Sequence, residues 1–289
     1  MEQKPLIIFD TDMDTDCDDA GALLLLINAH KKAQIDLIGV VADSDCCCAA
    51  PFCTEILSYC GLDVPIGQVH GYIENPKRLN EYHEHQKMCT DRAYNKTASK
   101  SDKEIYNATS LYLSLLKNAP DKGVSIVCVG MLTAVYEAVK ADTALFEQKV
   151  SKVIIMGNPY KKNDFNFSMD AESTKGFFEF CPVSCYISYL GSEIITGNYL
   201  DKTLQGDHPV RRAYEIWSGG QGRSSWDLIA ALYALNPSSD IFKTVEVGKI
   251  SYDVNERATT IDKNGTRDTV IGLSITNEEM AQMLNNLLI

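Results

Sequence analysis

Residues 6–27 read LIIFDTDMDTDCDDAGALLLLI. An apolar run of strand length, 6–9, leads into six aspartates between residues 10 and 19, and an apolar stretch typical of a helix follows at 20–30. A strand that passes through a polar turn into a helix is the repeating unit of a parallel α/β sheet, in which ligands bind beyond the carboxyl ends of the strands. The aspartates therefore stand where an α/β protein would hold its ligand.

The rest of the chain continues this alternation of strands and helices. Further runs of strand length lie at 35–42, 64–67, 124–130, 150–157 and 185–191. Helical stretches lie at 51–59, 103–118, 132–141, 171–180, 225–235 and 277–288. The alternation predicts a Rossmann-like α/β fold, with a mostly parallel central sheet and helices on both of its faces.

Two segments depart from this alternation. Residues 244–275 alternate apolar and polar side chains around Asn264-Gly265, which predicts a β-hairpin or a small antiparallel C-terminal appendage. The polar stretch 71–101 is too long for an ordinary connector, so we expect an active-site flap or a short helical excursion there. Because the chain contains no repeat and no linker, we expect residues 1–289 to form a single domain.

The composition is that of a globular protein with an acidic surplus. The 289 residues include 27 basic and 39 acidic side chains, for a net charge of −12, which argues against a nucleic acid as partner. No apolar run approaches the roughly 20 residues that span a bilayer, and the N-terminus lacks the pattern of a signal peptide. We therefore expect a cytoplasmic protein that does not enter a membrane. The ten cysteines, three of them consecutive at 46–48, are expected to be reduced thiols.

The crowded aspartates predict a metal site. Like charges at such spacing raise one another's pKa and destabilise a fold unless a cation or hydrogen-bond donors compensate them. The dipole of the following helix would favour Asp18 and Asp19 at its start, which accounts for two of the six. For the others, a hard divalent cation held by oxygen ligands, Ca²⁺ or Mg²⁺, is the natural partner.

Two familiar aspartate motifs fit this segment less well. An EF-hand loop needs glycine at its sixth position, where this chain offers Thr15 or Cys17. A phosphohydrolase of the haloacid-dehalogenase type would use Asp10 and Asp12 and would need a hydroxyl two residues later. Asp14 stands there instead and would repel a phosphate, so this reading remains only as an alternative.

The aspartate pattern resembles that of the inosine-uridine-preferring nucleoside hydrolase family. In that family a strand ends in Asp-x-Asp, and Asp-Asp-Ala follows before a helix. Asp10 and Asp12 match the first pair, and Asp18 and Asp19 match the second, with two extra residues between the pairs. The resemblance implies that Asp12 is the catalytic base and that Asp12 and Asp19 bind calcium. Alignment from the helix would favour Asp14 over Asp12, and we prefer Asp12 because the preceding strand sets its position.

Further motifs of the family follow in the same order. The strand-to-helix turn after residue 128 resembles the one whose backbone carbonyl binds calcium, which implies that role for Val129. The segment 222–228 resembles the one that carries the last calcium ligand, which implies Asp227. Asp164, in place of the family's glutamate, and Asn166 match residues that bind ribose hydroxyls together with Asp18.

The chain also departs from the family. Trp226 stands where a histidine often protonates the departing base, so we expect Trp226 either to stack on the base or to be a core residue. The usual His-Gly segment is replaced by residues 82–85, and His83 or His85 is a candidate acid.

The resemblance implies a nucleoside salvage enzyme. It would hydrolyse the N-glycosidic bond of a ribonucleoside to free base and ribose, with a calcium-bound water activated by Asp12. It also implies a homo-oligomer, either a dimer or a tetramer. The alternative is a calcium-dependent nucleoside- or sugar-binding protein with little catalysis. The sequence leaves the preferred base open.

Overall fold

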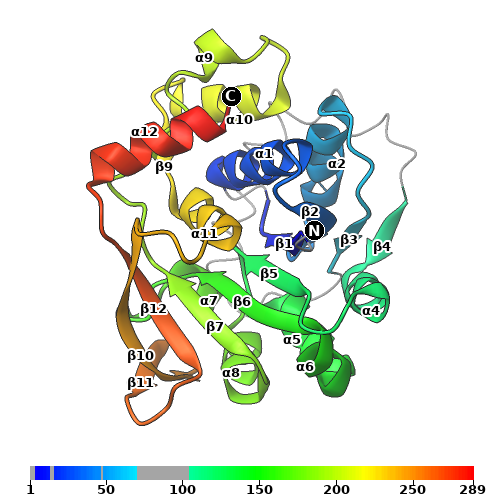
Figure 1. Ribbon diagram of the computed structural model, residues 1–289, viewed down its shortest axis with the longest axis vertical. Coiled ribbons are helices and arrows are strands. Elements are labelled where there is room, and N and C mark those ends of the chain that lie inside the picture. The colour runs from blue at the N-terminus through cyan, green and yellow to red at the C-terminus, as the bar shows by residue number, and fades with distance from the viewer. Residues whose placement is uncertain (1–3, 14–15, 47, 70–103) are drawn as a thin grey trace.

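The computed structural model describes residues 4–13, 16–46, 48–69 and 104–289. The predicted flap at 71–101, with His83 and His85, lies outside the described residues, as does Asp14. The described chain is built around a ten-stranded sheet with the order β11-β10-β12-β7-β6-β5-β1-β2-β3-β4 (Figure 1).

Most strands of this sheet are parallel. The strands are β1 Leu6–Thr11, β2 Asp36–Ala42, β3 Ile66–Gln68, β4 Ile105–Asn107, β5 Val124–Cys128, β6 Val150–Met156, β7 Ser184–Ser188, β10 Phe242–Asp253, β11 Ala258–Asp262 and β12 Asp268–Leu273. All neighbours from β12 through β7 to β4 pair in parallel, and β10 pairs antiparallel with β11 and β12. A separate ribbon joins β8 Ile195–Thr196 to β9 Arg223–Ser224. The predicted Rossmann-like α/β fold with a small antiparallel part is confirmed.

Helices cover both faces of the sheet (Figure 1). One face carries α1 Asp18–Lys31, α2 Ala49–Tyr59, α10 Pro209–Ser218, α11 Trp226–Leu235 and α12 Asn277–Leu287. The other carries α4 Ala108–Asn118, α5 Thr133–Ala141, α6 Thr143–Lys149 and α8 Ala171–Phe180. Strand β1 shows why two cores form: Ile7 and Phe9 pack into the first and Ile8 into the second, because neighbouring strand residues point to opposite faces. Two short helices, α7 Phe165–Met169 and α9 Leu200–Thr203, complete the fold.

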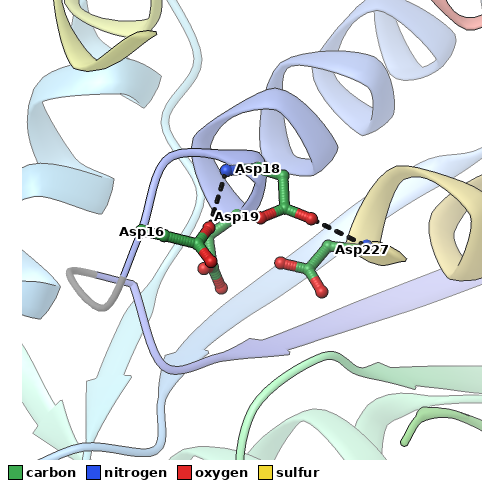
Figure 2. Close-up of side chains that lie close together, drawn as sticks. All are labelled: Asp16, Asp18, Asp19 and Asp227. Carbon is green, nitrogen blue, oxygen red and sulfur yellow. Dashed lines mark hydrogen bonds between the residues drawn. The ribbon is translucent and has the colours of Figure 1, made fainter. Parts of the chain in front are cut away.

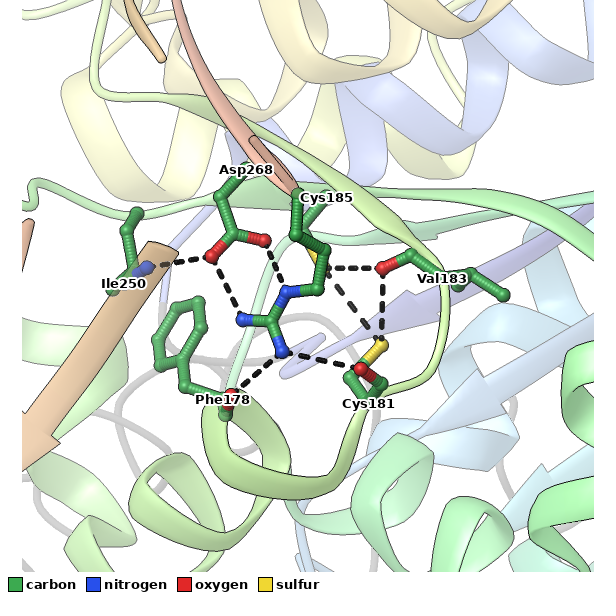
Figure 3. A network of polar contacts seen from close by, with 7 residues as sticks. Phe178, Cys181, Val183, Cys185, Ile250 and Asp268 are labelled. Atoms are coloured by element: carbon green, nitrogen blue, oxygen red, sulfur yellow. Dashed lines mark hydrogen bonds and ion pairs between the residues drawn. The ribbon is translucent and has the colours of Figure 1, made fainter. Parts of the chain in front are cut away.

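The C-terminal strands continue the main sheet instead of forming a separate hairpin at Asn264-Gly265. Strand β10 lies between β11 and β12, and β12 joins the sheet in parallel to β7. A buried ion pair supports this junction (Figure 3): Arg267 donates to both carboxylate oxygens of Asp268 at 2.6 and 2.7 Å. Asp268 also accepts from the backbone N–H of Ile250 in β10, and Arg267 donates to the carbonyl of Phe178 in α8. The pair thus ties β10, β12 and α8 together.

Within the described residues, no helix has both the length and the apolar character needed to cross a bilayer.

Candidate active site

A pocket of about 750 Å³ opens at the carboxyl ends of β1, β5 and β6, beside the N-terminus of α11. The eight residues that the sequence assigns to catalysis, metal binding or substrate binding all line it: Asp12, Asp18, Asp19, Val129, Asp164, Asn166, Trp226 and Asp227. They come from four separate segments of the chain, and the parallel sheet brings them together because its strands end at one edge.

Four carboxylates meet in this pocket (Figure 2). Asp16, Asp18, Asp19 and Asp227 each offer an oxygen, and these oxygens lie within 4.8 Å of one another. Helix α1 begins at Asp18, and the backbone N–H of Asp227, in the first turn of α11, donates to Asp18 at 3.2 Å. Two helix N-termini therefore converge here, and their dipoles favour negative charge.

Burial makes this cluster electrostatically costly without a counter-ion. Asp18 and Asp19 are 1% exposed and Asp227 is 4% exposed. Burial first, and then repulsion from neighbouring aspartates, raises the pKa of all three carboxyls well above the usual range. Burial also acts to raise the pKa of Asp16, but hydrogen bonding with Asp18 and the charge of Arg223 lower it below its ordinary value. Closely spaced, buried carboxylate oxygens of this kind fit a hard divalent cation.

Asp12 lies beside the cluster, outside the group of four. It is 3% exposed and lines the pocket, and its charge contributes to the raised pKa of both Asp19 and Asp227. Asp10 lies behind the pocket, where its carboxylate accepts a hydrogen bond from the Tyr112 hydroxyl. Burial raises the pKa of Asp10 to about 7.

The carbonyl of Val129 follows β5 and is fixed from two sides. The Val129 N–H donates to the backbone oxygen of Asp10 at 2.8 Å, and its carbonyl accepts from the Asn166 side chain at 2.6 Å. The next residue must be glycine, because a Cβ on Gly130 would lie 2.5 Å from the backbone nitrogen of Asp12. The β1 and β5 ends are therefore in direct backbone contact at the site.

Asp164 shapes the wall that carries Asn166. Its carboxylate accepts from the backbone N–H groups of Asn158 at 3.1 Å and Phe167 at 3.3 Å, so it caps the short helix α7. This capping role is an addition to the ribose contact that the sequence predicts.

The pocket lining also contains aromatic and cationic side chains. Trp226 is half-buried and begins α11, so it is a pocket residue and not a fully buried core residue. The guanidinium carbon of Arg223 lies 4.8 Å from the centre of the Trp226 ring and 5.4 Å from that of Trp217. Arg223 also donates to Asp16 at 2.9 Å. Sequence reasoning missed Arg223, Trp217 and the role of Asp16; the position of Asp16 among the six aspartates was the one available signal.

Comparison with known proteins agrees with this geometry. Residues 7–283 match the inosine-uridine preferring nucleoside hydrolase family. No curated protein matches the chain in sequence.

Solved structures share the fold over the whole chain. They include an inosine-uridine preferring nucleoside hydrolase from Bacillus anthracis, with 14% identity, a TM-score of 0.73 and 99% of each chain covered. A plant nucleoside hydrolase has 17% identity and a TM-score of 0.73, again with 99% of each chain covered. The type III effector protein XopQ, complexed with adenosine diphosphate ribose, has 13% identity and a TM-score of 0.75, with 100% of this chain and 94% of that chain covered. At these identities the likeness establishes the fold alone.

The family match spans all the segments that build the pocket. The chain therefore belongs to the inosine-uridine preferring nucleoside hydrolase family, hydrolases that act on N-glycosyl bonds.

Proposed function

We propose that this protein hydrolyses the N-glycosidic bond of a ribonucleoside, releasing the free base and ribose. The observation that carries the proposal is the buried carboxylate cluster in a pocket that also has an indole wall. A transition state with cationic character at the sugar is stabilised by negative charge, and aromatic rings suit a flat base.

The proposed cation ligands are Asp12, Asp19, Asp227 and the Val129 carbonyl, with Ca²⁺ as the ion. Asp16 and Asp18 adjoin them, and the short distances among the four clustered carboxylates support a cation in this place. When bound, a divalent cation would lower the pKa of a water molecule and orient the sugar hydroxyls.

The remaining chemistry belongs to the side chains. Asp12 takes the proton of the attacking water, and it lies nearly buried beside the cluster, where a base is shielded from bulk solvent. Asp18, Asp164 and Asn166 bind ribose hydroxyls, which accelerates the reaction only where these hydrogen bonds tighten as the ring flattens. Trp226, together with Trp217, offers the base an aromatic surface.

A second candidate is a nucleoside- or sugar-binding protein with little catalysis. It is motivated by Trp226, because an indole has no proton to give at neutral pH, and by the described lining residues, which include no histidine. The fold neighbour XopQ is complexed with adenosine diphosphate ribose, so that compound belongs among the ligands to be tested.

Incubation with a panel of ligands separates the two candidates. The purified protein is mixed with inosine, uridine, adenosine, guanosine, cytidine and adenosine diphosphate ribose, and the released base and reducing sugar are measured. Hydrolysis predicts release of base that stops with a chelator and returns with added Ca²⁺. Binding by calorimetry without any release would favour the binding protein.

A further inference from the structure

We propose that Arg223 stabilises the departing base in this hydrolysis, with Asp16 as the residue that positions it. The inference rests on the proposed function and names a specificity-determining contact for it. It follows from the position of a half-buried guanidinium that lies over two indole rings in the pocket and is bound on one edge to Asp16.

The reaction needs such a group because of where its electrons go. When the bond between C1′ and the base nitrogen breaks, its electron pair stays on the base. The water oxygen bonds to C1′, one water proton goes to Asp12, and the base finally takes a proton from solvent. Until then the base carries developing negative charge, which a fixed cationic donor stabilises. Arginine remains protonated throughout, so it acts as a hydrogen-bond donor and not as an acid.

Arg223 is better suited to this task than the other cation of the pocket. Its side chain is 28% exposed and is therefore largely shielded from solvent, where a charge acts more strongly. Lys161, the other basic residue among the described lining residues, is exposed at the rim. Tyr189 also lines the pocket. It packs edge-to-face against Tyr160, and the Tyr160 hydroxyl donates to Glu246 of β10, so Tyr189 belongs to the wall beside the antiparallel strands.

The guanidinium is also held in one orientation. Its carbon lies 5.4 Å from the centre of the Trp217 ring and 4.8 Å from that of the Trp226 ring. One of its nitrogens, Nη2, donates to Asp16. Its Nε–H is buried and has no acceptor among the described residues. An arginine carries five N–H donors in a rigid plane, so the contact with Asp16 leaves others for a base heteroatom. A donor fixed in advance does not have to reorganise when the charge develops.

Substrates with different leaving groups test the role of Arg223. We compare a natural ribonucleoside with p-nitrophenyl riboside, whose nitrophenolate departs without assistance. Arg223→Gln is expected to lower kcat on the nucleoside by about 10²- to 10³-fold, while kcat on p-nitrophenyl riboside changes by less than about fivefold and Ca²⁺ affinity by calorimetry is unchanged. Arg211→Gln is the matched control, because Arg211 also forms an ion pair, with Glu215 of α10, but does not line the pocket, so the substitution should alter neither substrate.

Several outcomes overturn the inference. These are an equal loss on both substrates in a variant with wild-type melting temperature, or no loss on the nucleoside. If Arg223→Gln does not fold, Arg223→Lys replaces it, and the same preferential loss on the nucleoside is required. The inference would also be overturned if Tyr189→Phe, and not Arg223→Gln, lost activity on the nucleoside while keeping its activity on p-nitrophenyl riboside. A wild-type protein that cleaves neither substrate would instead overturn the proposed hydrolysis.

A double-mutant cycle tests the part played by Asp16. If Asp16 acts by positioning Arg223, then Asp16→Asn shows the same leaving-group dependence, and the double variant is no slower than Arg223→Gln alone. Losses that multiply would show that Asp16 acts independently, and they would contradict its positioning role.

Discussion

The side-chain amide nitrogen of Asn166 lies 2.6 Å from the carbonyl oxygen of Val129. Val129 begins the turn after β5, and Asn166 belongs to the short helix α7 that follows β6, so the contact joins two neighbouring strand ends across the pocket. This hydrogen bond links a proposed cation ligand, the Val129 carbonyl, to a proposed ribose-binding residue, Asn166. A substitution at Asn166 should therefore also alter the binding of the cation.

Asn166→Ala removes the donor that orients the Val129 carbonyl. Residues that orient metal ligands typically contribute 10- to 100-fold in affinity, so Ca²⁺ affinity measured by calorimetry should fall by about tenfold or more. The KM for the nucleoside should rise as well, since a ribose contact is lost. Asn118→Ala is the control, because Asn118 is an exposed residue outside the pocket whose side chain donates to the Ser114 carbonyl within α4. Unchanged Ca²⁺ affinity in Asn166→Ala would contradict the role proposed for this contact.

Gly130→Ala tests the close packing of β1 against the turn after β5. The new methyl group would lie 2.5 Å from the backbone nitrogen of Asp12 and 2.6 Å from a carboxylate oxygen of Asp43. Because a backbone nitrogen cannot rotate away as a side chain can, the strand end that carries Asp12 must shift, and a displacement of about 1 Å in an active site costs roughly 10²-fold in rate. Steady-state kinetics and thermal unfolding should both show the loss. Gly206→Ala, whose methyl group would meet nothing closer than 4.0 Å, should behave like wild type.

The stability of the metal-free protein should fall as the pH rises. Burial raises the pKa of Asp10 from 3.8 to about 7, and the pKa values of Asp18, Asp19 and Asp227 are also raised. The folded state then binds protons that the unfolded chain has already released between about pH 4 and pH 7, so stability is lost across that range. For Asp10 alone the difference corresponds to about 4 kcal/mol, or a melting temperature lower by roughly 8 °C.

Differential scanning fluorimetry in chelator at pH 5 and pH 8 measures this effect. Added Ca²⁺ should raise the melting temperature far more at pH 8, where the carboxylates are ionised, than at pH 5. A Ca²⁺ effect of the same size at both values would argue against a cation in the aspartate cluster.

Arg267→Gln should destabilise the fold without touching the pocket. Asp268 is 1% exposed and has its two oxygens paired with Arg267, so the substitution leaves a buried carboxylate uncompensated. The expected loss is about 3–5 kcal/mol in the free energy of unfolding, measured by urea denaturation. Lys162→Gln breaks an exposed pair with Glu256 and should cost less than about 1 kcal/mol. Similar costs for the two variants would show that the buried pair does not stabilise the junction of β10 and β12.

The eight site residues named from the sequence line one pocket, for a reason that the sequence itself contains. The apolar run of β1 and the helix after it place Asp12, Asp18 and Asp19 at one strand end, and Val129 and Asn166 follow later strands. In a parallel sheet all these ends lie at the same edge, so the order of the motifs along the chain predicts their proximity in space.

Contacts that depend on tertiary packing could not be predicted in the same way. The pair Asp16–Arg223 joins residues 207 positions apart through the loop before α1 and the ribbon strand β9. The alternation around Asn264-Gly265 indicates strands, but it does not show that β12 pairs with β7. At this junction Arg267 and Asp268 bond to partners in α8 and β10, which are distant in the sequence.

Asp12→Asn tests the central claim, that this pocket hydrolyses nucleosides with Asp12 as the base. The substitution keeps the size of the side chain and removes its ability to take a proton. At saturating Ca²⁺, with nucleoside binding confirmed by calorimetry, release of base should slow by about 10²- to 10⁴-fold while the melting temperature stays near that of wild type. Release of base by a folded, nucleoside-binding Asp12→Asn variant within about threefold of the wild-type rate would contradict the account.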